Sequence, residues 1–435
     1  MPDQPEEGGR RRGPRPRLSR RAFLKAGAVA GGAAALTGGS VLLTACGDDD
    51  DDSAAVIDPE EIEPRFVDFY GPHQTGITAR PVPTLGLMAS FKVLSPDRES
   101  LRDTFVELTD EIQGLMAGRP PTIRPEAYPP TDSGLLGAEP EPDDLSVVVS
   151  VGSSLFDDRY GLADKQPVEL VRMPFLANDR LDPARTHGDL LLNIDARHPD
   201  TIQFALRQLM RRRRRDLVLH WIIDGYTRGG TVNDGTAGAP RNLLGFKDGT
   251  ANLDSSDDEA MNRFVWIQPE DNQPEWSIGG SYQAVRIIRM FVEFWDRTPL
   301  AEQEAIMGRH KLSGAPLGQV HESDTPSFSN DPDGETTPLD AHIRLANPRT
   351  AATDESLIFR RGFSYTRGYD GAGRLDMGLA FVSYQRSFVK GFLAVQERLA
   401  GEPLEEYILP EGGGFFFALP GVPEPGRYLG DGLFA

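Results

Sequence analysis

The order in which strand-like and helix-like segments follow one another constrains the fold of this 435-residue chain more than any single motif does. In the first half, apolar residues in strand patterns occupy residues 84–93, 145–156, 187–196 and 216–226. Helical spacing predicts helices over residues 97–118, with Asp97 or Ser100 as the N-cap, and over residues 199–214. Strand–helix–strand, taken twice, is the element order of a ferredoxin-like domain.

The second half repeats this rhythm, although no repeat is visible in the sequence itself. Strands are predicted at residues 280–295, 357–365 and 378–386. Helices are predicted at residues 299–311 and 388–401. A chain this long exceeds one ordinary hydrophobic core. We therefore predict an α+β protein of two packed ferredoxin-like halves, residues 63–225 and 226–435, with antiparallel sheets and peripheral helices in a dimeric α+β barrel-like arrangement.

The first 62 residues read as a targeting segment and a linker rather than as fold. Arg20 and Arg21, followed by Ala-Phe-Leu, resemble a twin-arginine export signal within residues 1–45. Cys46, the only cysteine, follows Leu-Thr-Ala as in a lipobox, which predicts lipidation and excludes disulfides. Residues 46–62 are predicted to be an acidic linker. We expect a protein anchored by lipid to the outer face of the cell membrane.

The charge balance of the chain limits its partners. The formal net charge is −20 although the first 45 residues are basic, so the acidic body is expected to repel nucleic acid. The run Arg211 to Arg215 departs from this balance. It precedes a predicted strand and is interpreted as the solvated cationic end of a helix, which suits the helix dipole.

A glycine-framed acid is the first chemical motif. The stretch "NLLGFKDGTANLD", residues 242–254, sets Asp248 between Gly245 and Gly249. Glycines permit backbone angles that other residues resist, so this segment can bend sharply and allow a phosphate, a metal or a flat cofactor to approach. The Gly-Lys-Ser/Thr ending of a phosphate loop is missing. The alternative is that Asp248 caps a turn.

A lone histidine and a pair of arginines are the other motifs. None of the chain's seven histidines stands four residues from another, so the sequence does not support a helical zinc site. His342, in "DAHIRLANPR", is either an ordinary polar residue or the single imidazole that is enough to hold a heme iron. Arg360 and Arg361 are neighbours on a predicted strand and face opposite ways. Either one reaches a buried pocket while the other stays in water, or both lie on the surface.

Many motifs, in order, carry a resemblance to a known family. They are "FYGPHQTGI", "SSLFDDRYGL", "HGDLLLNI", "NLLGFKDGTANL", "GGSYQAVRIIRM", "DAHIRLANPR", "IFRRGFSY", "GLAFVSYQ" and "EEYILPEGGGFFFALPG". This set resembles the dye-decolorizing (DyP-type) heme peroxidases, in the exported, iron-uptake branch called deferrochelatase/peroxidase. The resemblance covers nearly the whole folded chain and implies two ferredoxin-like halves with heme b in the C-terminal one.

The resemblance also implies roles for individual residues. His342 corresponds to the proximal iron ligand, Asp248 to the distal acid–base residue and Arg360 to the distal arginine. Glu405, with Glu406 as the alternative, is expected to accept the proton of the far His342 nitrogen. The residues expected to line the heme are Gly249, Thr250, Ala251, Asn347, Pro348, Arg349, Leu379 and Phe381, the last two with core packing as the alternative. Gly362 stands where some relatives carry Asn, so distal control is expected from Asp248 and Arg360 alone.

The function implied is reduction of hydrogen peroxide with oxidation of a bulky or iron-containing donor, together with release of iron from heme. The alternative is a heme- or iron-binding component of an uptake system whose peroxidase activity is incidental, and a third reading is an acidic structural lipoprotein. An iron-uptake permease and a second copy of the chain are further expected partners. Trp266, Trp276 and Tyr365 are candidate electron relays for donors too large to enter a pocket, with core packing as the alternative.

Overall fold

The structure is a computed structural model and describes residues 66–228 and 239–435. The predicted signal peptide, Cys46 and the acidic linker lie outside the described residues. Within residues 66–228 and 239–435, no helix combines the length and apolar character needed to cross a membrane.

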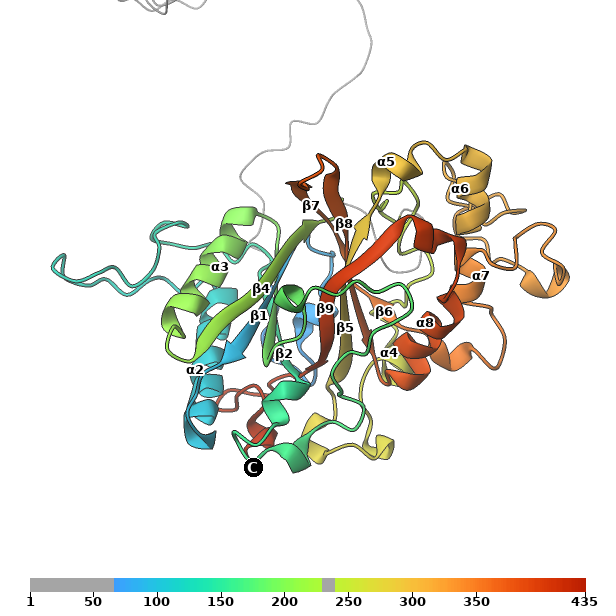
Figure 1. Cartoon of the computed structure of the whole chain (residues 1–435). Helices are drawn as coiled ribbons and strands as arrows, with labels where there is room; N and C mark the ends of the chain where they lie inside the picture. Colours follow the sequence, from blue (N-terminus) through green and yellow to red (C-terminus); the bar gives the residue numbers. More distant parts are fainter. Residues whose placement is uncertain (1–65, 229–238) are drawn as a thin grey trace, which may run out of the picture. The chain divides into compact units, whose positions relative to one another are not determined.

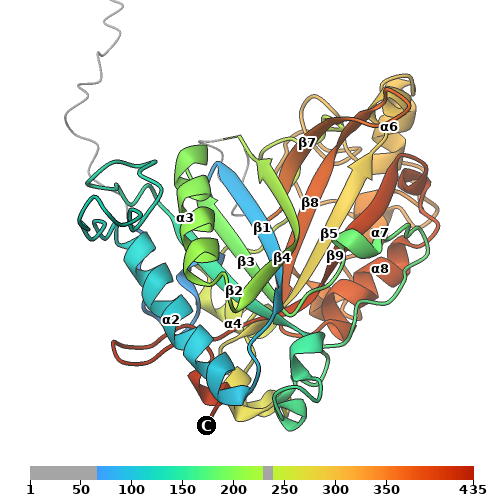
Figure 2. The same ribbon diagram turned by 60° about the vertical axis from the view of Figure 1, so that its left-hand side comes forward.

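The first half has the predicted ferredoxin-like topology (Figures 1 and 2). Its strands pair antiparallel in the order β4-β1-β3-β2, and α2 and α3 pack against this sheet. The elements are β1 (Leu85–Val93), α2 (Arg98–Met116), β2 (Ser146–Gly152), β3 (Leu190–Ala196), α3 (Pro199–Arg212) and β4 (Leu217–Tyr226). Asp97 is the N-cap of α2, because its carboxylate accepts a hydrogen bond from the Ser100 amide.

The second half has the same topology, since its strand order β9-β5-β8-β7 corresponds to β4-β1-β3-β2 of the first half. Its strands are β5 (Ser281–Met290), β6 (Phe359–Arg360), β7 (Phe363–Tyr369), β8 (Leu375–Gln385) and β9 (Ile408–Ala418). Its helices are α4 (Asp258–Phe264), α5 (Val292–Trp295), α6 (Leu300–Met307), α7 (His342–Ala346) and α8 (Ala394–Leu399), the last preceded by a π-helical turn (Val389–Leu393).

Two predictions about these elements were wrong, and one strand was missed. The strand predicted over residues 280–295 ends at Met290, and residues 292–295 form α5. The strand predicted over residues 357–365 is divided into β6 and β7, with Gly362 in the break. β9 was not predicted as a strand, because Pro410 and three consecutive glycines hide its pattern. Those glycines allow close pairing: a Cβ on Gly413 would lie 2.0 Å from the Val285 carbonyl oxygen of β5.

The two sheets join at both ends, β2 to β9 and β4 to β7, and β8 pairs with β5, so the pairing runs in a ring. Side chains from both halves fill the space between the sheets, among them Met88 and Leu191 from the first and Val285, Val382 and Phe416 from the second. The prediction of two ferredoxin-like halves in a barrel-like α+β fold is confirmed. The closed ring places the outer face of β5 and β8 against the helices of the second half, where the candidate site lies.

Candidate functional site

A cavity of about 290 Å³ is lined mainly by the second half, through β5, β8, α7, α8 and the glycine-framed loop, and also by residues 176–179 of the first half. It collects most of the residues that the sequence singles out: Asp248, Gly249, Thr250, Ala251, His342, Asn347, Arg349, Arg360, Leu379, Phe381 and Glu405. Pro348 does not line it. In the described part of the chain, no group of three or more His, Cys, Asp or Glu side chains could hold a metal ion.

The glycine-framed loop bends as expected and presents Asp248 to the cavity. Gly245 and Gly249 have φ values of 86° and 123°, which side chains other than glycine rarely adopt. The Asp248 amide donates to the Pro240 carbonyl at 2.8 Å, which fixes the bend. The Asp248 carboxylate accepts a hydrogen bond of 2.8 Å from Arg360 Nη1. This side chain therefore forms an ion pair at the cavity rather than a turn cap.

Arg360 is aligned by a residue that sequence reasoning missed. Asn252 Nδ2 donates to the Arg360 carbonyl at 2.9 Å, and the Arg360 amide donates to Asn252 Oδ1 at 2.8 Å. This reciprocal pair ties β6 to the glycine-framed loop and sets Arg360 beside Asp248. Asn252 lies within the quoted motif, but nothing in its local pattern distinguishes it from an ordinary turn residue.

Arg361 departs from both sequence alternatives. It follows the end of β6, and its side chain is only 5% exposed instead of lying in water. Its guanidinium lies 3.9 Å from the Asp195 carboxylate and donates to the Ala79 carbonyl. Burial raises the pKa of Asp195 to about 6, against the opposing charge of Arg361. Arg361 thus belongs to the packing between the two sheets.

His342 begins α7 and is held by a carboxylate that the sequence did not single out. Its Nδ1 lies 2.7 Å from Glu402 Oε2, and the Glu402 side chain is 4% exposed. The expectation of Glu405 or Glu406 is wrong, because a short 3₁₀ turn (Pro403–Glu406) sets Glu402 at its N-cap and directs Glu405 to the Gly401 amide. Burial favours the neutral imidazole, but Glu402 outweighs it, so the pKa of His342 is raised above its usual value.

One part of the cavity lining is cationic. Arg309, Arg349 and Arg360 all belong to it. Burial, with Arg349 and Arg360 close by, lowers the pKa of Arg309 to about 10, which still leaves it charged at neutral pH. Arg309 donates to the Gly314 and Glu322 carbonyls and is therefore held in place. Such a lining suits a ligand that carries carboxylates.

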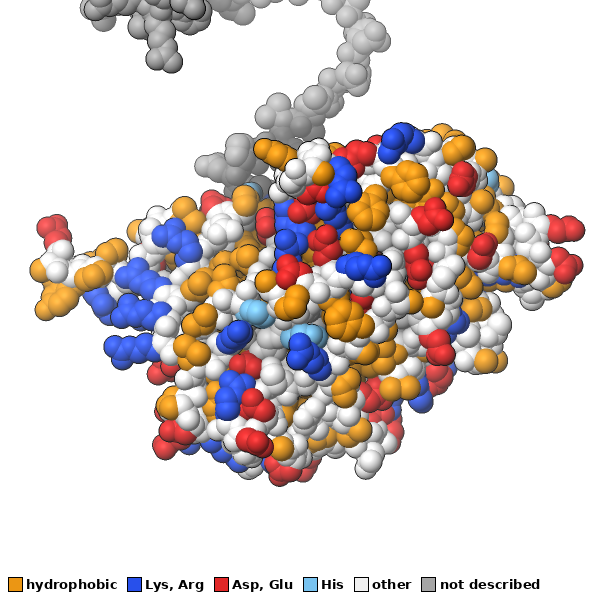
Figure 3. Space-filling model, in the orientation of Figure 1, with side chains coloured by type: hydrophobic (Ala, Val, Ile, Leu, Met, Phe, Trp, Pro, Cys, Tyr) orange, Lys and Arg blue, Asp and Glu red, His pale blue; other side chains and the backbone are white. Residues whose placement is uncertain are grey.

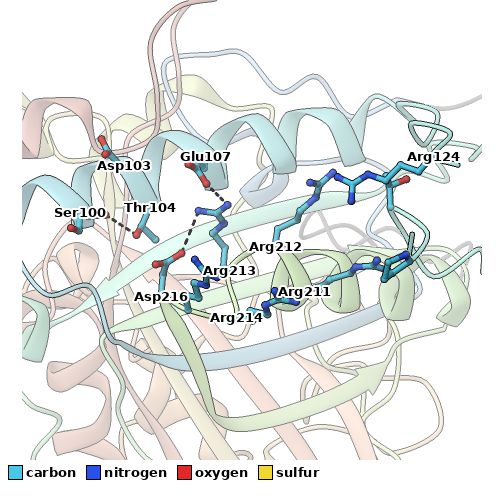
Figure 4. Close-up of a pocket in the computed structure, with 13 residues that line it drawn as sticks. Ser100, Asp103, Thr104, Glu107, Arg124, Arg211, Arg212, Arg213, Arg214 and Asp216 are labelled. Atoms are coloured by element: carbon cyan, nitrogen blue, oxygen red, sulfur yellow. Dashed lines mark hydrogen bonds and ion pairs between the residues drawn. The ribbon is translucent and has the colours of Figure 1, made fainter. Parts of the chain in front are cut away.

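The arginine run of the first half lies in a separate groove of about 620 Å³ between α2 and α3 (Figure 4). Figure 3 shows Lys and Arg side chains gathered over α3. Arg213 pairs with Glu107 and Asp216, and Arg211 donates to the Pro130 and Asp132 carbonyls. α3 ends at Arg212. Acidic side chains from α2 thus lie along the cationic end of α3.

The aromatic residues named as electron relays lie apart from this cavity. Trp266 and Tyr365 are buried, and Trp276 packs edge-on against Phe417. None of these three side chains lines the cavity. Their role in electron transfer stays a prediction.

Comparison with known proteins assigns both halves of the chain to one family. The family model described as "Dyp-type peroxidase, N-terminal" matches residues 74–227, and the one described as "Dyp-type peroxidase, C-terminal" matches residues 239–423. A relative named Deferrochelatase, from Escherichia coli K12, is 49% identical over 367 residues, which cover 84% of this chain and 86% of the relative. A Deferrochelatase of Shigella flexneri is also 49% identical, with 84% and 87% covered.

Solved structures agree with this assignment. A DyP-type peroxidase from Cellulomonas bogoriensis matches with a TM-score of 0.75 and 31% identity, covering 85% of this chain and 98% of its own. Ferric DtpA from Streptomyces lividans matches with a TM-score of 0.76 and 32% identity, covering 85% and 97%. The chain belongs to the DyP-type peroxidase family, in the branch that contains the deferrochelatases, and is a heme-dependent peroxidase.

Proposed function

We propose that this peroxidase reduces hydrogen peroxide in the cavity of its second half, with heme b bound through His342. The observation that carries the proposal is that the His342 imidazole, the Asp248 carboxylate and the Arg360 guanidinium all line a single cavity. The three side chains line the same cavity, and Arg360 Nη1 donates to the Asp248 carboxylate at 2.8 Å.

The residues present fit a heme. Glu402 occupies Nδ1 of His342 and thereby leaves Nε2 as the nitrogen for iron. Leu379, Phe381 and Ile288 supply apolar surface for a flat ring. Arg309, Arg349 and Arg360 suit the two propionates. Heme iron supplies the site where peroxide binds and the oxidising equivalents that a donor later consumes.

The protein's own contribution is proton transfer and charge stabilisation. The Asp248 carboxylate takes the proton from one peroxide oxygen and returns it to the other, which leaves as water. Arg360 stabilises the ionised carboxylate and the negative charge that develops on the departing oxygen. Two electrons from the donor and two further protons complete the reduction of one peroxide to two waters. A protein that only carried heme would have no use for this ion pair, so the alternative of a pure binding component is not favoured.

We further propose that the same cavity releases iron from intact heme, as the name Deferrochelatase states for the relatives. Incubation of the protein with heme and a reductant is expected to yield free protoporphyrin in step with ferrous iron, because the departing iron must be replaced by two protons on pyrrole nitrogens. Porphyrin fluorescence and a ferrous chelator measure the two products. Release of iron together with opened-ring pigments, and no protoporphyrin, would contradict the proposal.

Protonation of His342 should compete with heme binding. Because Glu402 raises the pKa of His342, heme affinity is expected to fall as the pH drops through that raised value. The Glu402→Gln variant should lower the pH at which half of the heme affinity is lost. The Glu405→Gln variant should leave that pH unchanged. Absorbance titrations with heme across pH measure both. Coinciding curves for wild type and Glu402→Gln would refute the assignment of Glu402.

We also propose export by the twin-arginine route and lipid anchoring at Cys46, beside the permease of an iron-uptake system and with self-association. The motifs at Arg20–Arg21 and Cys46 support the export and the lipid anchor. The Cys46→Ser variant is expected to be exported but to appear in the soluble fraction outside the cytoplasm. Cell fractionation with immunodetection measures this, with Arg20→Lys/Arg21→Lys as the control that should block export. Membrane retention of exported Cys46→Ser protein would contradict the anchor.

A further inference from the structure

A long connection from the first half reaches across to the heme cavity of the second half. Residues 166–186, here called the crossover segment, join β2 to β3, run along the second half and return (Figures 1 and 2). Backbone hydrogen bonds hold its last part to β9: the Arg180 amide donates to the Pro410 carbonyl at 2.9 Å, and the Asp182 amide to the Glu411 carbonyl at 2.7 Å. At its start, the Glu169 carboxylate accepts from the Ser387 hydroxyl.

Between these attachments, residues 176–179 of the crossover segment form one wall of the cavity. Phe175, just before it, is 74% exposed, while Met173 is buried and Leu176 packs against the hydrophobic core. Asn178 Nδ2 donates to the Glu405 and Ile408 carbonyls at 3.2 and 2.9 Å, which connects the wall to the loop that follows Glu402.

The strongest link is a buried ion pair. Asp179 accepts two hydrogen bonds from the fork of the Arg286 guanidinium, one of them 3.1 Å long between Nη1 and Oδ2. The two side chains are 1% and 2% exposed. Asp179 Oδ2 also accepts from the Leu176 amide at 2.9 Å, which folds the wall back on itself. Arg286 lies in β5 directly opposite Phe381 of β8, so it projects from the sheet that floors the cavity.

Stability alone does not explain why an ion pair lies in the apolar floor of the cavity. Removing both charges from water costs more than their attraction returns unless the geometry is exact, and apolar pairs of similar size often serve folding equally well. The two-pronged geometry of Arg and carboxylate gives direction that an apolar contact lacks. Here the paired hydrogen bonds fix Asp179, from the first half, against Arg286 of β5. Among the described residues, Arg286 is the only side chain that links the cavity floor to this wall through two nitrogens of a guanidinium.

We propose that Asp179 and Arg286 act as a clasp that holds the crossover segment as a wall of the heme cavity, and so determine how long heme stays bound. They are positioning residues, since they act on heme through the wall. The inference rests on the assignment of this cavity as the heme site. It gives the first half a direct part in heme retention, which matters for a protein that must take up heme and let porphyrin go.

The test replaces the pair by apolar residues in the holoprotein, as Asp179→Leu/Arg286→Met. Folding should survive, with an apoprotein melting temperature close to wild type. Heme transfer to excess apomyoglobin should accelerate by about tenfold or more, as expected when a coupled buried pair is lost. Trypsin should cut faster after Arg172 in the apoprotein. The matched control is Asp370→Leu/Arg289→Met, which removes another ion pair of β5, of 2.8 Å, away from the cavity.

The outcomes separate the clasp from the site itself. Wild-type rates of heme transfer and trypsin cleavage in a folded double variant would overturn the clasp. If the double variant does not fold, Arg286→Lys, which keeps the charge but loses the fork, carries the same two measurements with the same expected direction. Retention of heme by His342→Ala with unchanged affinity would instead overturn the site on which the clasp depends.

Discussion

Replacement of His342 by Ala is expected to abolish specific heme binding. Among the described residues that line the cavity, His342 is the only histidine, and Glu402 orients it through Nδ1. Loss of an oriented ligand should lower heme affinity by more than about 100-fold, since removal of a supporting partner alone costs 10- to 100-fold. Titration of apoprotein with heme, followed by the Soret band, measures this. His342→Gly with added imidazole should restore the band, because the cavity left by the side chain accepts a free ligand.

The control for this variant is His310→Ala. His310 also has Nδ1 against a carboxylate, Glu304, at 3.0 Å, but it does not line the cavity. Its loss should leave heme affinity unchanged. A His342→Ala protein with the wild-type ferric spectrum and affinity would remove the basis of the site.

Replacement of Asp248 by Asn should leave heme bound and slow the reaction with peroxide. The amide is close in size to the carboxylate but cannot take up the peroxide proton, so the second-order rate constant is expected to fall by about 10²- to 10⁴-fold. Arg360→Ala should cost about 10²- to 10³-fold. Because the two side chains act on one proton and one charge, the double variant should lose less than the product of the two effects. Stopped-flow absorbance of the heme band against peroxide concentration measures these rates.

Asp376→Asn is the matched control for Asp248→Asn. Asp376 accepts a 2.9 Å hydrogen bond from Arg367, much as Asp248 does from Arg360, but it lies outside the cavity. Its rate constant should equal that of wild type. Full peroxide reactivity in the Asp248→Asn/Arg360→Ala protein would mean that proton transfer uses another group.

Local patterns predicted most of the fold because helices and half-buried strands carry their periodicity in neighbouring residues. The cap at Asp97 and the elements of the first half illustrate this. The same reasoning did not predict β9, because the glycines that allow its close contact with β5 have no apolar pattern. The reasoning also missed the end of β5 and the start of α5, because aromatic residues such as Phe294 and Trp295 occur in helices and strands alike.

By itself, the sequence determined the order of the elements and the residues whose chemistry stands out: Asp248 in its glycine frame, the lone His342 and Arg360. Only the tertiary structure decided which side chains contact and position the residues of the site. Glu402 rather than Glu405 meets His342, Asn252 aligns Arg360, and Asp179 crosses from the other half to Arg286. Such partners are separated by 60 to 108 residues along the chain. Long-range contacts of this kind depend on how whole sheets and loops pack, which no local spacing records.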